Sequence, residues 1–523
     1  MPETDPAAAA TEIAAGYAAQ GGALELGTVV VDGTAHPDAA VRIPLATLNR
    51  HGLVAGATGT GKTKTLQLMA EQLAAAGVPV VLADMKGDLS GLSAPGEAGE
   101  KIAARAADTG DDWAPTSCDT QFLSLGTEGI GVPLRATVTS FGPVLMSKVL
   151  ALNPTQESVL GLIFHWADTR GLPLLDLKDL RAVLTHLTSD EGKSELQGIG
   201  GVSRASAGVV LRSIAVLEAA GGDTFFGEPE IDPADLMRVV DGRGVISLVE
   251  LGTDAARPVL FSTFLMWLLA TLFEELPEEG DLPAPKLVFV LDEAHLLFAD
   301  ASKAFLAQVE QTVKLIRSKG VSVFFCTQQP TDVPDAVLSQ LGARIQHALR
   351  AFTPDDQTAL ARTVRTYPRT GHYDLEEALT TLGTGEAIVT VLSERGAPTP
   401  VAWTRLRAPR SLMASIGTDA IRAAAAGSEL AGRYGTTVDR ESAYEQLAAR
   451  LAPPPEPAAP PSSSPAAVEP YGAPAQPGPP AEEKESFFAG VLGNPAVKSF
   501  LRSAASAAGR EIARGAFGTR RRR

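Results

Sequence analysis

One glycine-rich motif constrains the fold of this chain more than any other feature of its sequence. Residues 56–63 read GATGTGKT, which matches G-x-x-x-x-G-K-[ST], and they stand between a short apolar run and a helical pattern. Gly56, Gly59 and Gly61 let the backbone curl until its N–H groups point at bound phosphates, and the positive end of the following helix strengthens that field. The motif in this setting predicts a parallel strand–loop–helix unit, and therefore an α/β fold.

The residues of this loop have distinct expected roles in binding ATP. Lys62 is expected to lie against the β- and γ-phosphates as a point charge, and the Thr63 hydroxyl is expected to coordinate Mg²⁺. The competing interpretation is a glycine-rich turn with an accidental lysine, and the strand and helix on either side argue against it. The predicted nucleotide-binding residues are Gly56, Ala57, Thr58, Gly59, Thr60, Gly61, Lys62, Thr63 and Lys64.

A second motif, LVFVLDEAH at residues 287–295, supplies two adjacent acids. Its hydrophobic strand carries Asp292 to the edge of the sheet where ligands bind in open α/β folds, so Asp292 is expected to hold Mg²⁺ through a water. Glu293 is expected to orient and deprotonate the attacking water. Two acids after a strand are common solvated residues in isolation, but beside the loop at 56–63 they predict ATP hydrolysis.

A third strand, VSVFFCTQQP at residues 321–330, follows Asp292 by one helix and is expected to lie beside the Asp292 strand. Gln328 at its tip is predicted to contact the γ-phosphate or the nucleophilic water, although a polar residue that caps a strand before Pro330 remains the alternative. Catalysis in a ring also requires a cation from the neighbouring subunit. Arg317, Arg344 and Arg350 are candidates, and a solvated surface arginine is the alternative for each.

Two further polar groups leave alternatives open. Asp84, Lys86 and Asp88 follow a predicted strand, and they either touch the Mg²⁺, the γ-phosphate or a moving strand, or belong to a solvated loop. His295 after the acid pair is interpreted as a packed or hydrogen-bonding side chain, because no second ligand with metal-binding spacing accompanies it.

Composition narrows the class of protein. The formal net charge of −16 argues against a surface coated with basic residues, yet it leaves room for a basic channel. Cys118 and Cys326 lack metal-ligand companions, so we expect neither disulfide nor zinc site and a cytoplasmic location. No signal peptide is visible. The apolar stretch from Pro258 to Phe273 is shorter than the ~20 residues of a membrane span, so we expect a buried helix and no transmembrane segment.

Patterning along the chain divides it into segments. The predicted order is an N-terminal extension (1–23), the P-loop half of an ATPase core (24–141), a helical insertion (142–242), the second half of the core (243–410), a helical segment (411–451), a disordered Pro/Ala-rich linker (452–480) and a basic amphipathic tail (481–523). The tail holds nine Lys and Arg against four Glu. It is expected either to bind a partner, DNA or an anionic membrane, or to act as a solubilising extension.

Taken together, HGLVAGATGTGKT, LVFVLDEAH and RSKGVSVFFCTQQP resemble the HerA/FtsK superfamily of ring-forming, DNA-pumping ATPases, and most closely its uncharacterised bacterial HerA-like members. The resemblance covers roughly residues 24 to 410. It implies a RecA-like core with a mostly parallel sheet, a homo-hexameric ring and movement of duplex DNA. HerA proteins also carry an N-terminal β-barrel, and the roughly 50 residues before this P-loop are too few for one, which puts any nuclease partner that docks through the barrel in doubt.

These observations favour a DNA translocase or helicase-like motor that uses ATP and Mg²⁺. A secretion- or protein-coupled ATPase shares the same motifs and remains a second possibility. A third is a nucleotide-dependent switch or scaffold with slow hydrolysis. The sequence alone does not separate them.

Overall fold

The computed structural model describes residues 5–84, 87–126, 129–196, 200–250, 258–280, 282–299 and 301–451. The predicted linker at 452–480 and the basic tail at 481–523 lie outside the described residues, as does Lys86.

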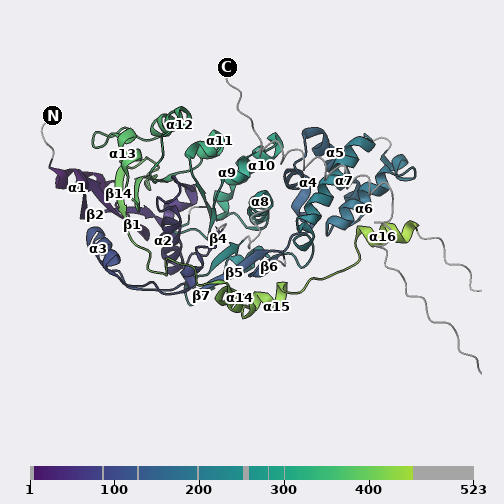
Figure 1. The fold of residues 1–523 in the computed structure, drawn as a ribbon, viewed down its shortest axis with the longest axis horizontal. Helices are drawn as coiled ribbons and strands as arrows, with labels where there is room; N and C mark the ends of the chain where they lie inside the picture. Colours follow the sequence, from purple (N-terminus) through teal and green to yellow (C-terminus); the bar gives the residue numbers. More distant parts are fainter. Residues whose placement is uncertain are drawn as a thin grey trace, which may run out of the picture. The chain divides into compact units, whose positions relative to one another are not determined.

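A single 12-stranded sheet organises the described chain, in the order β2-β1-β14-β13-β12-β3-β11-β10-β4-β9-β5-β6 (Figure 1). Within the run from β12 to β6 all neighbouring strands are parallel to each other, whereas the pairs β12–β13, β13–β14, β14–β1 and β1–β2 are antiparallel. The prediction of an α/β fold with a mostly parallel sheet is confirmed. The strands are β1 (Ala23–Val31), β2 (Thr34–Pro44), β3 (Gly52–Ala55), β4 (Val80–Asp84), β5 (Thr120–Leu125), β6 (Val132–Leu134), β9 (Ile246–Glu250), β10 (Leu287–Leu291), β11 (Val321–Thr327), β12 (Ala343–Gln346), β13 (Glu386–Thr390) and β14 (Ala402–Leu406), with a separate hairpin of β7 (Val239–Val240) and β8 (Arg243–Gly244).

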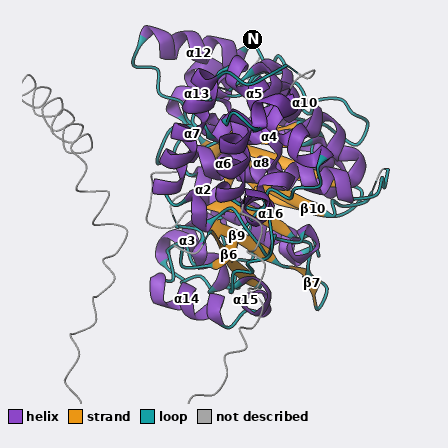
Figure 2. Cartoon of the chain, turned by 90° about the vertical axis from the view of Figure 1, so that its right-hand side faces the viewer, coloured by secondary structure: helices purple, strands orange, loops and turns teal. Residues whose placement is uncertain are grey.

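Helices cover the sheet and extend beyond it (Figure 2). They are α1 (Pro6–Ala15), α2 (Lys62–Ala75), α3 (Glu100–Thr109), α4 (Val138–Val149), α5 (Pro154–Thr169), α6 (Leu177–Thr188), α7 (Arg204–Ala219), α8 (Pro258–Glu275), α9 (His295–Phe298), α10 (Lys303–Ile316), α11 (Asp335–Leu338), α12 (Pro354–Val364), α13 (Leu375–Thr381), α14 (Thr418–Ala426), α15 (Glu429–Tyr434) and α16 (Ala443–Leu451). Short 3-10 turns are η1 (Leu45–Arg50), η2 (Ser90–Ser93), η3 (Gly192–Leu196), η4 (Gly222–Thr224), η5 (Pro233–Leu236), η6 (Arg317–Lys319) and η7 (Pro330–Asp332).

The most apolar stretch forms part of α8, as a buried helix. Phe264, Trp267 and Leu268 on it are each at most 1% exposed, because the helix packs against α4, α9 and α10. No helix in the described ranges has both the length and the apolar character that crossing a membrane requires.

Helices α4 to α7 occupy much of the predicted insertion and pack on one another and on α8. Their buried side chains belong to the same hydrophobic cluster as the parallel strands, so the predicted insertion shares one core with the main sheet. Helix α4 bends where Gly142 has φ +73° and Pro143 follows, since proline cannot continue the hydrogen-bond ladder. The last described helix, α16, packs on α6.

The residues before the P-loop form an edge of the main sheet. β1 pairs with β2 on one side and with β14 on the other, both antiparallel. These strands bury Leu24, Leu26, Val29, Val41 and Ile43 in the common core. The N-terminal strands therefore extend the main sheet by pairing with β14, which lies far along the sequence.

A strap of residues 407–412 follows β14 and lies along the P-loop helix α2. The Glu71 carboxylate, which is 4% exposed, accepts hydrogen bonds from the backbone N–H groups of Arg410 at 2.8 Å and Ser411 at 3.1 Å. Gln67 Nε2 donates to the Leu412 carbonyl at 2.9 Å. Helix α2 therefore buries polar side chains, and the strap supplies their hydrogen-bond partners.

Candidate functional site

The predicted nucleotide loop leaves the C-terminal end of β3 and enters α2. Gly56, Gly59 and Gly61 have φ values of +152°, +83° and +115°, a region that side chains rarely adopt. A Cβ at Gly56 would lie 2.5 Å from Cβ of His347, and one at Gly61 would lie 3.2 Å from the Gly385 nitrogen. A Cβ at Gly59 would meet no described atom within 4 Å. The loop is therefore packed against neighbouring residues at Gly56 and Gly61, and it is open at Gly59, where phosphates would approach.

Lys62 lies inside the curl of the loop. Its Nζ donates to the Gly56 carbonyl at 2.6 Å and to the Ala57 carbonyl at 3.2 Å. Both Lys62 and Thr63 are half-buried at the start of α2. The ammonium is held by neutral carbonyls alone in this arrangement, and phosphate oxygens would be stronger acceptors for it.

The end of β12 and the start of β13 support this loop. Ala57 N–H donates to the Ala348 carbonyl at 2.8 Å, and Gly385 N–H donates to the Thr60 carbonyl at 3.1 Å. His347 Nε2 lies 2.9 Å from Thr65 Oγ1. Burial, with a further contribution from the Lys62 charge, lowers the pKa of His347 to about 4. A neutral imidazole therefore supports the loop without competing with Lys62 for phosphate.

Strand β11 lies between the P-loop strand and the Asp292 strand. It pairs in parallel with β3, matching Thr327 to Ala55, and with β10, matching Leu291 to Phe325. The prediction that the 321–328 strand lies beside the Asp292 strand is confirmed. The three strand ends consequently meet at one edge of the sheet.

Cys326 on β11 shows how close the charged groups come. Burial raises the pKa of its thiol well above the ordinary value, and the Asp292 carboxylate raises it further, whereas the Lys62 charge lowers it. Glu293 also raises it. The buried thiol therefore feels the charges of Lys62 from the P-loop and of Asp292 and Glu293 from the second motif. Sequence reasoning did not single out Cys326, because a lone cysteine belongs to no motif.

Glu293 has a strained backbone, with φ +47°. Its N–H donates to Asp292 Oδ1 at 2.8 Å, and the next residue, Ala294, donates to the Cys326 carbonyl at 2.9 Å. Its side chain is 14% exposed, and Oε2 lies 3.4 Å from His295 Nδ1. The tight turn after β10 therefore directs a largely desolvated carboxylate beside Asp292, and it places His295 next to that carboxylate.

Gln328 is the first residue beyond β11, and its side chain is exposed. Thr327, the residue before it, pairs with Ala55, so Gln328 is level with the first residue of the P-loop. The following turn is fixed by Asp332, whose carboxylate accepts from Thr327 Oγ1 at 2.6 Å and from Gln329 N–H at 3.0 Å. Gln328 is positioned next to the loop by a rigid turn, and its contact with the γ-phosphate stays a prediction.

The three candidate arginines lie in different places. Arg317 opens η6 at the end of α10, just before β11 begins, and Arg344 lies near the start of β12 with its Nη1 2.6 Å from Thr366 Oγ1. Both are at the strand ends opposite to the phosphate loop, so the structure does not bring them into their own site. Arg350 does reach its own loop, donating to the Thr58 carbonyl at 3.2 Å.

The carboxylate row extends beyond Asp292. Val290 pairs with Leu82, and Asp84 pairs with Glu250, so acidic residues end three successive parallel strands. Asp84 accepts from the N–H groups of Gly87 at 2.8 Å and Leu89 at 2.9 Å, which fixes the loop after β4. The prediction for Asp88 stays open, because no contact to a ligand tests it.

Glu250 was not predicted. It is 4% exposed, and its Oε1 has no hydrogen-bond partner within the part of the chain that the structure describes. Burial, with a contribution from Asp84, raises the pKa of Glu250 to about 7. The available signal was an acid at the end of the apolar run GVISLVE, the same pattern that identified Asp292.

The oxygen donors available near the loop suit Mg²⁺. Thr63 offers a hydroxyl and Asp292 a carboxylate, and Mg²⁺ is usually held by one or two such side chains together with phosphate and water oxygens. Among the described residues no group of three or more His, Cys, Asp or Glu side chains is arranged to hold a metal ion. The donor set fits an ion that arrives with a nucleotide.

The chain is similar to known proteins over most of its length. The family model described as helicase HerA-like C-terminal matches residues 30–523. The bacterial conjugative coupling protein TrwBdeltaN70 is similar in structure, with a TM-score of 0.50 and 16% identity over 77% of this chain and 94% of that one. At this identity the similarity shows the fold, a RecA-type core.

Two further solved structures match with lower scores. The plasmid coupling protein TrwB in complex with ADP and Mg²⁺ has a TM-score of 0.48 and 16% identity over 73% of this chain and 92% of that one. VirB4 of Thermoanaerobacter pseudethanolicus has a TM-score of 0.47 and 14% identity over 74% of this chain and 97% of that one. No curated protein matches the sequence.

Proposed function

This chain belongs to the helicase HerA-like C-terminal family, and from that membership we propose that it is an ATP-hydrolysing motor that forms a hexameric ring and moves duplex DNA. The observation that supports hydrolysis most strongly is the strand register: β11 pairs in parallel with both β3 and β10, so the P-loop with Lys62 and the turn with Asp292 and Glu293 follow strand ends at the same edge of the sheet. A binding site for nucleotide alone has no need of a desolvated carboxylate beside the Mg²⁺ aspartate.

Binding uses the open side of the P-loop. The loop N–H groups and the start of α2 receive the phosphates, and Lys62 exchanges the carbonyls of Gly56 and Ala57 for phosphate oxygens. Bound Mg²⁺ supplies positive charge at the β- and γ-phosphates, and Thr63 and Asp292 are the residues that would hold it. Lys64 Nζ donates a hydrogen bond to Gln67 Oε1 at 3.0 Å, so its ammonium group lies on the α2 side of the site.

Hydrolysis places a water between Glu293 and the γ-phosphorus. Glu293 accepts the water proton while the new P–O bond forms and the bond to the β–γ bridging oxygen breaks. The bent backbone at Glu293 aims its carboxylate at this position, and Gln328 on the neighbouring strand end orients the water or the γ-phosphate. A second chain would supply Arg317 or Arg344, since neither lies in its own site, whereas Arg350 serves its own loop at Thr58.

The decisive experiment is ATP hydrolysis by the full chain with and without duplex DNA. Lys62→Ala and Glu293→Gln are the matched controls: the first should lose nucleotide binding, whereas the second should bind a fluorescent ATP analogue and not turn it over. Stimulation by duplex DNA that fades as salt rises supports the motor proposal. Turnover that depends on Lys62 but ignores DNA contradicts it and favours a protein-coupled motor.

Ring formation is tested separately by mass. Light scattering on Glu293→Gln with ATP and Mg²⁺ should give the mass of a hexamer, because the trapped nucleotide holds adjacent copies together. A monomer under these conditions contradicts the ring. If a hexamer forms, Arg317→Ala and Arg344→Ala can identify the arginine that acts in trans. Substitution of that arginine should lower turnover at least tenfold without weakening nucleotide binding.

A further inference from the structure

Three exposed arginines lie together on and just beyond helix α12. Arg362 is in the last turn of α12 (Pro354–Val364), Arg365 caps the helix, and Arg369 follows it. Arg362 and Arg365 are three residues apart at the end of the helix, and Arg369 follows in the loop beyond it; all three are exposed, while Leu360, Thr363 and Tyr367 are buried. We name Arg362, Arg365 and Arg369 the α12 arginine surface. Helix α12 lies at the periphery in both views (Figures 1 and 2).

No acidic side chain neutralises this surface. None of the three guanidinium groups has a hydrogen bond or ion pair with any residue that the structure describes. Three other exposed arginines do have partners: Arg181 is 3.0 Å from Glu218, Arg204 is 3.0 Å from Asp190, and Arg422 is 3.1 Å from Asp419, whereas Arg212 and Arg395 have none among the described residues but stand singly in the sequence. The α12 surface is therefore a local excess of positive charge on a chain whose formal net charge is −16.

The helix dipole accounts for only part of this arrangement. Asp355 and Asp356 in the first turn and Arg362 in the last turn complement the dipole of α12. Arg369 lies beyond the helix, outside the last turn where the dipole acts. Between residues 344 and 373 the sequence has five arginines and two aspartates, and Arg344 reaches the same region through its hydrogen bond to Thr366. The basic region thus continues from the helix to the sheet.

We propose that the α12 arginine surface binds the phosphate backbone of duplex DNA. This inference rests on the proposed function and names the residues that would carry it. Guanidinium groups bind phosphate oxygens through two parallel N–H donors, and several on one exposed face suit a repeating anion. Contacts of this kind are independent of base sequence, as a motor that passes along DNA requires. One arginine would be enough to contact the nucleotide phosphates of a neighbouring copy, whereas the α12 arginine surface has three.

The test compares two matched triple variants of the full chain. One replaces Arg362, Arg365 and Arg369 by Ala, and the control replaces the ion-paired Arg181, Arg204 and Arg422 by Ala. Affinity for a fluorescein-labelled duplex is measured by anisotropy over a salt series. The α12 triple should bind about tenfold to a hundredfold more weakly, and its log-affinity slope against log salt should fall by about two to three, since each lost phosphate contact removes ~0.9. The control triple should match the wild type.

Replacing the three α12 arginines by Lys should restore the salt dependence and part of the affinity, because Lys keeps the charge but lacks the two parallel donors of a guanidinium group. The sequence at 481–523 is the same in all variants, so its contribution cancels. Equal duplex binding by the wild type and the α12 triple overturns this inference and leaves the motor proposal standing. A wild type that hydrolyses ATP but does not bind duplex overturns both.

The DNA-free ATPase activity gives the remaining readout. It should be unchanged in the α12 triple at every protein concentration. If the α12 triple instead loses DNA-free turnover while its duplex affinity stays intact, the surface contacts a second copy of the chain, and the inference is overturned.

Discussion

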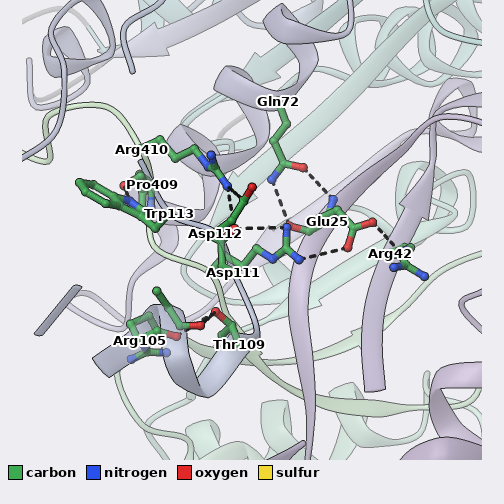
Figure 3. Close-up of polar contacts among 12 residues, drawn as sticks. Glu25, Arg42, Gln72, Arg105, Thr109, Asp111, Asp112, Trp113, Pro409 and Arg410 are labelled. Carbon is green, nitrogen blue, oxygen red and sulfur yellow. Dashed lines mark hydrogen bonds and ion pairs between the residues drawn. The ribbon is translucent and has the colours of Figure 1, made fainter. Parts of the chain in front are cut away.

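Two groups of three arginines on this chain differ in what surrounds them. Arg405, Arg407 and Arg410, here called the paired arginine group, lie on β14 and the strap and contact acids: Arg405 is 2.6 Å from Asp108 and 2.9 Å from Glu386, and Arg410 is 2.7 Å from Asp111 (Figure 3). The α12 arginine surface has no such contacts in the described chain. The paired group holds β14 and the strap against α3 and α2, whereas the α12 group contributes nothing to the fold.

The difference shows that a cluster of arginines in the sequence does not reveal its role until the residues that contact it are known. Both groups repeat arginine at short spacing, R-L-R-A-P-R in one case and R-T-V-R-T-Y-P-R in the other. Figure 3 shows Arg410 beside Asp111 and Asp112, with Glu25 near Arg42 and Gln72. Partners that come from far along the chain convert the first group into structure. Four predictions follow from this contrast, from the largest effect on stability to the smallest.

Glu71→Ala should be the most damaging change in the paired region. It removes the acceptor of Arg410 N–H, Ser411 N–H and Ser411 Oγ, leaving buried donors without partners. We expect a loss of about 3 kcal/mol in the free energy of unfolding, measured by urea denaturation. Glu12→Ala, at an exposed position of α1, is the control and should have little effect. A Glu71→Ala protein as stable as the control would show that the strap does not hold α2.

Glu250→Gln tests a buried carboxyl that forms no ion pair with any residue in the described ranges. Its pKa is raised from the ordinary value to about 7, so the folded state favours the protonated form and loses stability as the pH rises from about 4.5 through 7. Gln removes that loss. The variant should equal the wild type near pH 4.5 and exceed it at pH 8 by up to about 3 kcal/mol. A difference in thermal midpoint that does not change with pH contradicts this assignment.

Arg405→Ala should cost about 2 kcal/mol at pH 7, because it leaves Glu386, whose side chain is 10% exposed, without its cation. Burial raises the pKa of Glu386, but hydrogen bonds from Gly383 N–H and Arg405 outweigh burial and keep that pKa below its ordinary value. Stability from this group is present above the unfolded pKa and is lost as the pH falls through the folded one. The cost of Arg405→Ala should therefore shrink on acidification below about pH 4.5. A cost that grows in acid would contradict the pairing.

The α12 triple should show the smallest effect on stability. Its three side chains are exposed and unpaired within the described chain, so their removal should change the free energy of unfolding by no more than about 0.5 kcal/mol. The measurement is urea denaturation beside Arg405→Ala. A triple variant that unfolds as readily as Arg405→Ala would erase the contrast between the two groups.

Sequence alone predicts the chemistry proposed for the nucleotide site. The loop at 56–63, the pair Asp292 and Glu293, and the adjacency of the 321–328 strand could be predicted, because a loop motif and apolar runs are local properties. β5 was not predicted, since its run TQFLSL mixes polar with apolar residues and is buried only by the strands beside it. β14 was missed for the same reason, and the residues before the P-loop gave no sign that they would pair with it.

Only the tertiary structure decided how these parts act together. The strand order placed β11, which carries Cys326, between the P-loop strand and the Asp292 strand, brought Glu250 next to Asp84, and paired β1 with a strand that lies 375 or more residues further along the chain. The same packing gave Glu71 its strap and left the α12 arginines without acids. Burial and electrostatic energies depend on which distant residues become neighbours, and a linear pattern does not contain that information.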